Sequence, residues 1–218
     1  MNVESSLNAW KRSSQGRIGA ILALLVALFA TSCGSVPKTS YYALQVPAAP
    51  SPADVRTTFS LGVEHFRAPL MLRDNRIVYY ASPTQMNFYQ YQRWGSDPAT
   101  MLSEYTAQWL SSTGVFAQVR MLPLSDPVDY ALGGRILSFE EVDADGGAKV
   151  RLGLALTLVR KSDHKLVWSG EQREESPLQG HGVEGVATAL NTSCAQALRE
   201  MIPGLIAQVE QDYKSSGK

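Results

Sequence analysis

The sequence has 218 residues, which is enough for one domain with a single core, and it carries 20 basic and 20 acidic side chains. This balance, without any dense run of lysine and arginine, argues against a nucleic-acid-binding protein, because phosphate binding needs a basic surface. The only cysteines are Cys33 and Cys194, so a disulfide-rich framework and a cysteine-based metal site are excluded.

The chain begins with the features of a bacterial secretion signal. Three basic residues, Lys11, Arg12 and Arg17, precede an apolar segment at residues 18–29. A helix of about twelve residues covers only ~18 Å of a ~30 Å hydrocarbon layer. We therefore expect a signal peptide over residues 1–32 rather than a permanent transmembrane helix.

The apolar segment ends in Ala-Thr-Ser-Cys at residues 30–33, which resembles a lipobox. We expect Cys33 to become the first residue of the mature protein, with S-diacylglycerol on its thiol and an N-acyl chain such as palmitate on its amine. Several acyl chains make membrane binding effectively stable. Gly34 follows the cysteine at the position where enterobacterial lipoproteins retained in the inner membrane carry Asp, so we expect the periplasmic face of the outer membrane. The alternative is an ordinary secreted protein cleaved near residues 30–32.

Residues 33–40 are small and polar, as in a flexible linker to a lipid anchor. One domain is expected over residues 41–213, followed by a polar tail at 214–218. Alternating apolar and polar residues predict short strands that form a meander in its first part. These strands are expected at residues 41–46, 59–66, 76–81 and 85–92.

A helix is expected over residues 98–112. Asp97 can cap the free amides of its first turn, Pro98 suits the first helical position, and Gly114 can supply a left-handed stop. Further strands are then expected at residues 116–121, 129–142, 148–161 and 165–174, the last three long and joined by tight turns.

From Val183 onward, apolar residues recur with a period of 3.6 and predict a long final helix that lies on the sheet and bends at Pro203. Cys194 falls on its apolar stripe, as a small buried residue would. Together, these elements predict a single-domain α+β fold, with a mixed, largely antiparallel sheet and two main amphipathic helices packed on it.

No motif in the domain points to an enzyme, a metal or a cofactor. Gly180, Gly182 and Gly185 have the spacing of a dinucleotide fingerprint, but no returning strand is expected after the helix that follows. The histidines lack metal-ligand spacing. Adjacent glutamates at 140–141 and 174–175 should point to opposite faces of their strands, unlike a cooperating acid and base.

An alternative from another class is a surface-tethered hydrolase acting on lipid or cell wall. Its nucleophile would be Ser96 or Ser169, with His181 as the base, although their spacing matches no known pattern.

Aromatic residues are frequent in the two strands expected at 76–81 and 85–92 and just after them. Core packing is their default role, but alternate side chains on neighbouring strands must face outward and could contact a partner. The candidates for such a contact are Tyr79, Tyr89, Tyr91, Arg93 and Trp94.

The chain resembles the ABC-type transport auxiliary lipoprotein family, which includes the PqiC-type lipoproteins. The features that carry the resemblance are the lipobox with Cys33, residues 41–44, residues 69–79, Arg93-Trp94 before a Pro-started helix, residues 136–140 and the closing amphipathic helix.

The resemblance implies a noncatalytic periplasmic component of a transporter that moves lipids or other hydrophobic compounds between two membranes. Its expected partners are an MCE-domain protein, a membrane permease and a cytoplasmic ATPase, and the resemblance also allows a homo-oligomer. A lipopolysaccharide-assembly lipoprotein of similar architecture is a further alternative.

Overall fold

The computed structural model describes residues 37–47, 55–123, 125–143, 147–178, 180 and 182–215. The chain divides into residues Met1–Lys38 and a compact unit, Thr39–Lys218, to which all the elements below belong. The expected signal segment and lipobox, with Cys33, lie outside the described residues, as do residues 216–218.

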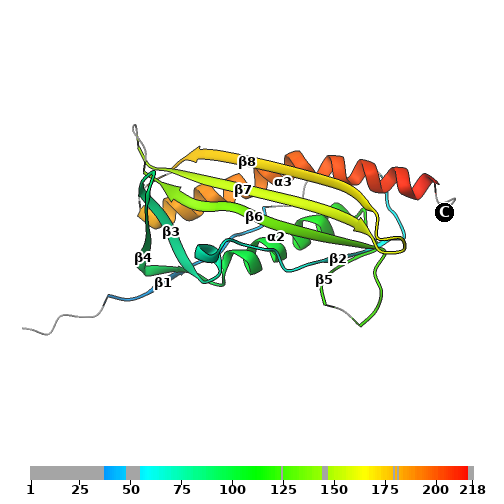
Figure 1. The fold of residues 1–218 in the computed structure, drawn as a ribbon, viewed down its shortest axis with the longest axis horizontal. Helices are drawn as coiled ribbons and strands as arrows, with labels where there is room; N and C mark the ends of the chain where they lie inside the picture. Colours follow the sequence, from blue (N-terminus) through cyan, green and yellow to red (C-terminus); the bar gives the residue numbers. More distant parts are fainter. Residues whose placement is uncertain are drawn as a thin grey trace, which may run out of the picture. The chain divides into compact units, whose positions relative to one another are not determined.

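Within the described residues, eight strands form one mixed sheet and two α-helices pack against it, so the predicted α+β fold is confirmed (Figure 1). In chain order the elements are β1 (Ser40–Tyr42), β2 (Ser60–Val63), a short 3-10 helix (Leu70–Leu72), β3 (Arg76–Ser82), β4 (Gln85–Trp94), α2 (Pro98–Thr113), β5 (Gln118–Met121), β6 (Tyr130–Val142), β7 (Lys149–Arg160), β8 (Leu166–Pro177) and α3 (Gly182–Ser215).

Strand β6 organises the sheet. Along one edge it pairs antiparallel with β7, which in turn pairs with β8. Its other edge is shared by two groups of strands. The first residues of β6 pair with β2, which in turn pairs with β5. The last residues of β6 pair with β3, which is followed in the sheet by β4 and then β1. The chain between β2 and β3 crosses the gap along β6, and Arg67 bridges to Arg135 there.

The predicted meander is wrong in the first part of the sheet. Only β3 and β4 form a hairpin; β1 pairs parallel with β4, and β2 pairs parallel with β5 and β6. Short strands have little local preference for a partner, so tertiary packing decides which edge they join.

The start and end of α2 follow the predicted capping. Asp97 accepts a 3.0 Å hydrogen bond from the Thr100 amide, and Gly114 ends the helix at a φ of 69°. A left-handed φ of this kind suits glycine, which has no Cβ.

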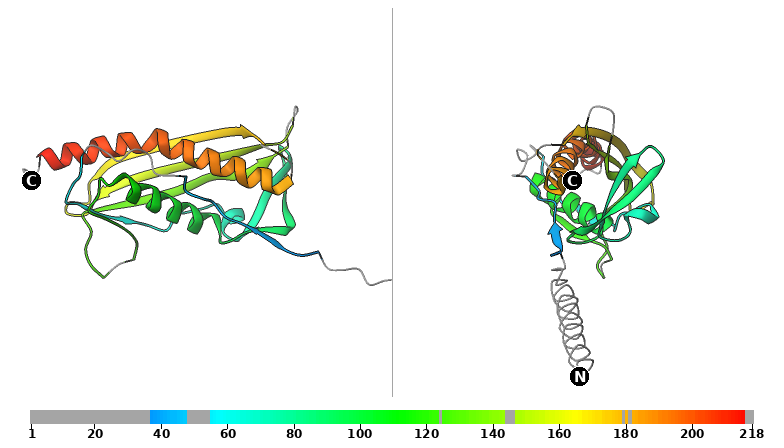
Figure 2. Two further views of the ribbon diagram at one scale, coloured as in Figure 1. Left: turned by 180° about the vertical axis from the view of Figure 1, so that it is seen from behind. Right: turned by 90° about the vertical axis from the view of Figure 1, so that its left-hand side faces the viewer.

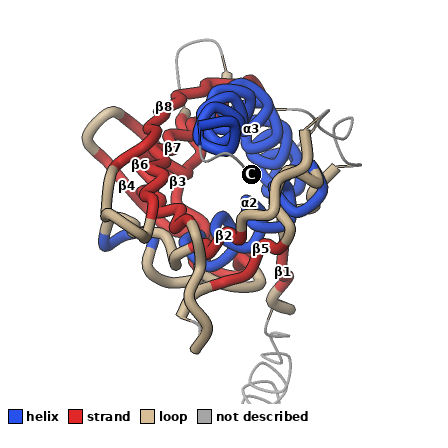
Figure 3. The backbone as a smooth tube through the Cα atoms, turned by 90° about the vertical axis from the view of Figure 1, so that its right-hand side faces the viewer, coloured by secondary structure: helices blue, strands red, loops and turns tan. Residues whose placement is uncertain are grey.

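The core lies between the helices and the long strands. On β7, alternate residues from Val150 to Leu158 are at most 1% exposed, as the alternation predicts. Helices α2 and α3 lie on the same side of β6, β7 and β8 (Figure 2, Figure 3). Cys194 is buried on the inner stripe of α3, and the helix continues through the exposed Pro203.

Candidate functional site

The β3–β4 hairpin carries most of the residues singled out for a partner contact. The rings of Tyr79 and Tyr89 lie against each other with centroids 4.9 Å apart. The Tyr89 hydroxyl donates a 2.6 Å hydrogen bond to Glu141 Oε2 on β6. Burial, together with this hydrogen bond, raises the pKa of Tyr89, so the phenol keeps its proton at neutral pH. Both rings are half-buried, which leaves part of their surface open to a partner.

Trp94 is a core residue, and the prediction that it contacts a partner is wrong for this structure. Its side chain is fully buried, and its ring centroid lies 5.1 Å from that of Phe139 on β6. Tyr91 and Arg93 are half-buried on the same strand. The alternation along β4 could not reveal this, because a hairpin with aromatic residues at successive positions has no clearly polar face.

The end of β4 meets two other segments and forms a corner of the domain. The Trp94 amide donates to the Asn75 carbonyl oxygen at 2.7 Å, and the Gly95 amide donates to that of Tyr42 at 2.7 Å. In the β1–β4 pairing, Tyr41 stands opposite Arg93. Loop 67–75, the end of β4 and strand β1 therefore come together, and we call these three segments the β1 corner.

The β1 corner is rich in arginine and exposes large apolar side chains. Arg67 and Arg73 line a cleft of about 430 Å³, together with His65 and Asp97. The Asp97 carboxylate is held by Thr100 at the start of α2. Only three large apolar side chains are strongly exposed among the described residues, and two of them belong to this corner: Leu70 at 81%, Tyr41 at 66% and, elsewhere, Leu166 at 55%. No local sequence pattern marks Leu70 or Arg67 as part of an exposed surface.

A second cleft, of about 530 Å³, lies beside the turn of the β3–β4 hairpin. Its two basic side chains are paired: Lys149 with Glu175, and Arg151 with Glu140 at 2.9 Å. Glu140 is buried, which raises its pKa despite hydrogen bonds from the Phe139 amide and Arg151. Its neighbour Glu141 instead accepts a hydrogen bond from Tyr89, so the two adjacent glutamates have different partners.

The residues of the hydrolase alternative show no catalytic arrangement where the structure describes them. Ser169 is exposed on β8 and Ser96 is half-buried after β4, and His181 lies outside the described residues. Across the described ranges, no three histidine, cysteine or acidic side chains gather in a way that could hold a metal ion.

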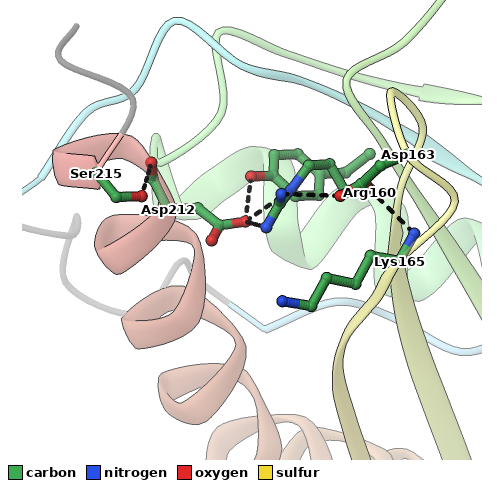
Figure 4. Close-up of polar contacts among 6 residues, drawn as sticks. Arg160, Asp163, Lys165, Asp212 and Ser215 are labelled. Atoms are coloured by element: carbon green, nitrogen blue, oxygen red, sulfur yellow. Dashed lines mark hydrogen bonds and ion pairs between the residues drawn. The ribbon is translucent and has the colours of Figure 1, made fainter.

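A partly buried charged cluster joins the end of α3 to the sheet (Figure 4). Asp212 Oδ2 accepts hydrogen bonds from Arg160 Nη2 at 2.8 Å, from Arg160 Nε at 3.1 Å and from the Tyr130 hydroxyl at 2.9 Å. Arg160 also contacts Asp163 at 3.2 Å. Burial and the bond to Asp212 raise the pKa of Tyr130. The cluster links β6, β7 and α3, and its role is therefore to stabilise the fold.

Helices in the described part of the chain are either too short or too polar to cross a bilayer. Two solved structures share the fold. Protein XCC0632 of Xanthomonas campestris, from family DUF330, is 22% identical with a TM-score of 0.71, and the match covers 80% of this chain and 99% of that one. An uncharacterized protein is 20% identical with a TM-score of 0.62 and coverages of 78% and 99%.

A search of curated proteins finds no match. The model of the family described as "ABC-type transport auxiliary lipoprotein component" matches residues 42–202, from β1 into α3. This match spans well over half of the chain and nearly the whole folded unit, and the chain therefore belongs to the ABC-type transport auxiliary lipoprotein family.

Proposed function

We propose that this protein is a noncatalytic outer-membrane lipoprotein that docks an ABC/MCE-type transporter of lipids or other hydrophobic compounds at the membrane. The observation that carries the proposal is the family match over residues 42–202, which begins nine residues after the lipobox cysteine. A lipobox directly before a domain of a transport auxiliary family fits a tethered adaptor.

The anchor in this proposal is Cys33, with S-diacylglycerol and an N-acyl chain. Strand β1 begins at Ser40, so six residues lie between the anchor and the sheet, and seven Cα-to-Cα steps connect the two. At ~3.4 Å per residue their extended reach is ~25 Å, which keeps the domain near the periplasmic face of the membrane.

The partner in this proposal is the periplasmic MCE-domain protein of the system, which acts with a permease and an ATPase. The ring pair of Tyr79 and Tyr89, with Tyr91 two residues further along β4, supports a contact through the β3–β4 hairpin. Rigid, half-buried tyrosines provide large contact area at low entropic cost, and they are enriched at protein interfaces.

Co-purification from solubilised membranes tests the proposal. The tagged full-length protein should recover the MCE-domain protein, and Tyr91→Ala should reduce this recovery, while Leu166→Ala, at the start of β8, should leave it unchanged. Cys33→Ala should release the protein from the membrane fraction. An acylated, membrane-bound protein that recovers no MCE-domain component would contradict the docking role.

A further inference from the structure

We propose that the β1 corner is a second membrane contact, which lies on phospholipid headgroups while the acyl chains on Cys33 hold the protein. The proposal rests on the proposed function for its anchor. It adds that the folded domain has a bilayer-facing surface of its own and hence a preferred orientation on the membrane.

The apolar part of this surface is Leu70, in the 3-10 helix of loop 67–75. Leu70 is 81% exposed, whereas Leu72, two residues later, is 1% exposed in the core. The loop is held in this conformation by the hydrogen bond from the Leu72 amide to the Pro69 carbonyl oxygen at 2.9 Å. It therefore presents one leucine outward on a short, fixed turn, as in protein segments that insert apolar side chains among lipid headgroups.

The charged part of the surface is formed by Arg67, Arg73 and Arg93. None of the three makes an ion pair with a residue that the structure describes. Among the residues that the structure describes, Arg73 donates only through its Nε, to the Ala68 carbonyl oxygen at 3.1 Å, and no described residue binds its terminal nitrogens. Guanidinium groups bind phosphate oxygens in a bidentate manner, and every phospholipid headgroup carries a phosphate.

Arg76 extends the basic surface, although Asp74 pairs with it at 2.7 Å. The acidic group that lines the cleft, Asp97, is occupied by its two hydrogen bonds from Thr100. The corner therefore has more arginine than free carboxylate, which suits a phosphate-covered surface.

The path of the chain favours a bilayer over a protein partner at this corner. Strand β1, which leads to the anchor, is one of the three segments of the corner, and Tyr41 on β1 is 66% exposed opposite Arg93. A tether of ~25 Å keeps these residues at high local concentration near the headgroups. Tyrosine is itself enriched at membrane interfaces.

The test uses the full-length, lipidated protein in vesicles of phosphatidylethanolamine and phosphatidylglycerol. An environment-sensitive NBD dye is attached to Leu70→Cys and, as the matched control, to Leu166→Cys. Leu166 is the other strongly exposed leucine and opens β8, at the end of the sheet opposite β1 (Figure 1). Tyr41 is less informative, because it lies close to the tether in every orientation of the domain.

The dye at position 70 should shift its emission to the blue on vesicles and be quenched by lipids that carry a shallow nitroxide, while the dye at position 166 should do neither. Arg67→Glu should lower the equilibrium constant for docking by about fivefold or more, because each basic residue near an anionic membrane surface raises this constant by about that factor. Arg173→Glu, on β8, is the matched control and should leave the signal unchanged.

A dye at position 70 that stays as water-exposed as the dye at position 166 would overturn the proposal. So would a signal that needs the transporter protein in addition to lipid, because the occupant would then be protein. Failure of the anchor is recognised separately: a parent protein whose Cys33 thiol takes up dye, or which does not float with vesicles, is not lipidated.

Discussion

Asp212, near the end of α3, accepts two hydrogen bonds from Arg160, the last residue of β7, across 52 residues of sequence. The Tyr130 hydroxyl at the start of β6 donates to the same carboxylate oxygen. One carboxylate thus fixes the last turns of a long helix against two strands (Figure 4).

Asp212→Asn should lower the free energy of unfolding by about 1.5–3 kcal/mol, the usual contribution of hydrogen bonds to a charged group. Urea denaturation measures the change. The control is Glu210→Gln on the same helix, whose ion pair with Lys214 is long, at 4.0 Å, and whose loss should cost less than about 0.5 kcal/mol. An Asp212→Asn variant as stable as the wild type would show that the cluster does not hold the helix end.

Gly134→Ala should destabilise the domain by about 1–3 kcal/mol, the usual cost of overpacking a core. A Cβ at this position would lie 2.4 Å from a ring atom of Phe66, which is buried. At the neighbouring Gly133 the atoms nearest to a Cβ would be Glu64 Oε2, at 3.2 Å, and Thr157 Oγ1, at 3.3 Å. The Glu64 side chain can move, so Gly133→Ala should change stability by less than about 0.5 kcal/mol. Equal thermal shifts for the two variants would refute this distinction.

Asp97 should make stability depend on acid pH. Burial alone would raise its pKa, but hydrogen bonds from the Thr100 hydroxyl and amide outweigh this effect and hold the pKa below its ordinary value. The charged cap therefore stabilises the fold above the unfolded pKa, and this contribution is lost as the pH falls through the lower folded pKa.

Two variants separate the cap from its charge. Asp97→Ala should cost about 1 kcal/mol near neutral pH, because the cap is lost. Asp97→Asn keeps an acceptor oxygen but no charge. Its free energy of unfolding should therefore be lower than that of the wild type at neutral pH, and the difference should disappear in strong acid. Urea denaturation at both pH values measures this, and a deficit that is independent of pH would contradict the role of the charge.

The sequence predicts the two helices and the strands β6, β7 and β8 because their signals are local. The cap Asp97, the stop Gly114 and the alternation from Val150 to Leu158 each act within a few residues. Such signals do not depend on which distant segment the element will meet.

No local sequence signal predicts that two groups of strands share one edge of β6, or that the segments of the β1 corner meet. Parallel pairing of β1 with β4 depends on packing between segments about fifty residues apart. Leu70 and Leu72 are the same residue type two positions apart, yet only Leu72 enters the core. Likewise, Arg93 and Trp94 are neighbours, and only the structure shows that Trp94 is buried.

The reactivity of the two cysteines connects the fold to the proposed anchor. Cys194 is 1% exposed on α3, and burial raises the pKa of its thiol, so a reactive thiolate does not form in the folded protein at neutral pH. In the proposed lipoprotein the Cys33 sulfur is already bonded to diacylglycerol. We therefore expect a maleimide to modify no thiol in the native lipoprotein and only Cys194 after unfolding in urea, as measured by mass spectrometry of the intact protein.

The Cys194→Ser variant is the control for this experiment, and it should remain unmodified both before and after unfolding. Modification of the folded variant would identify a free thiol at Cys33 and contradict the lipid anchor. Modification of the folded wild type that disappears in Cys194→Ser would instead show that α3 opens under native conditions, and would leave the anchor unaffected. The two cysteines thus report on two separate claims, because one is protected by packing and the other by a covalent bond.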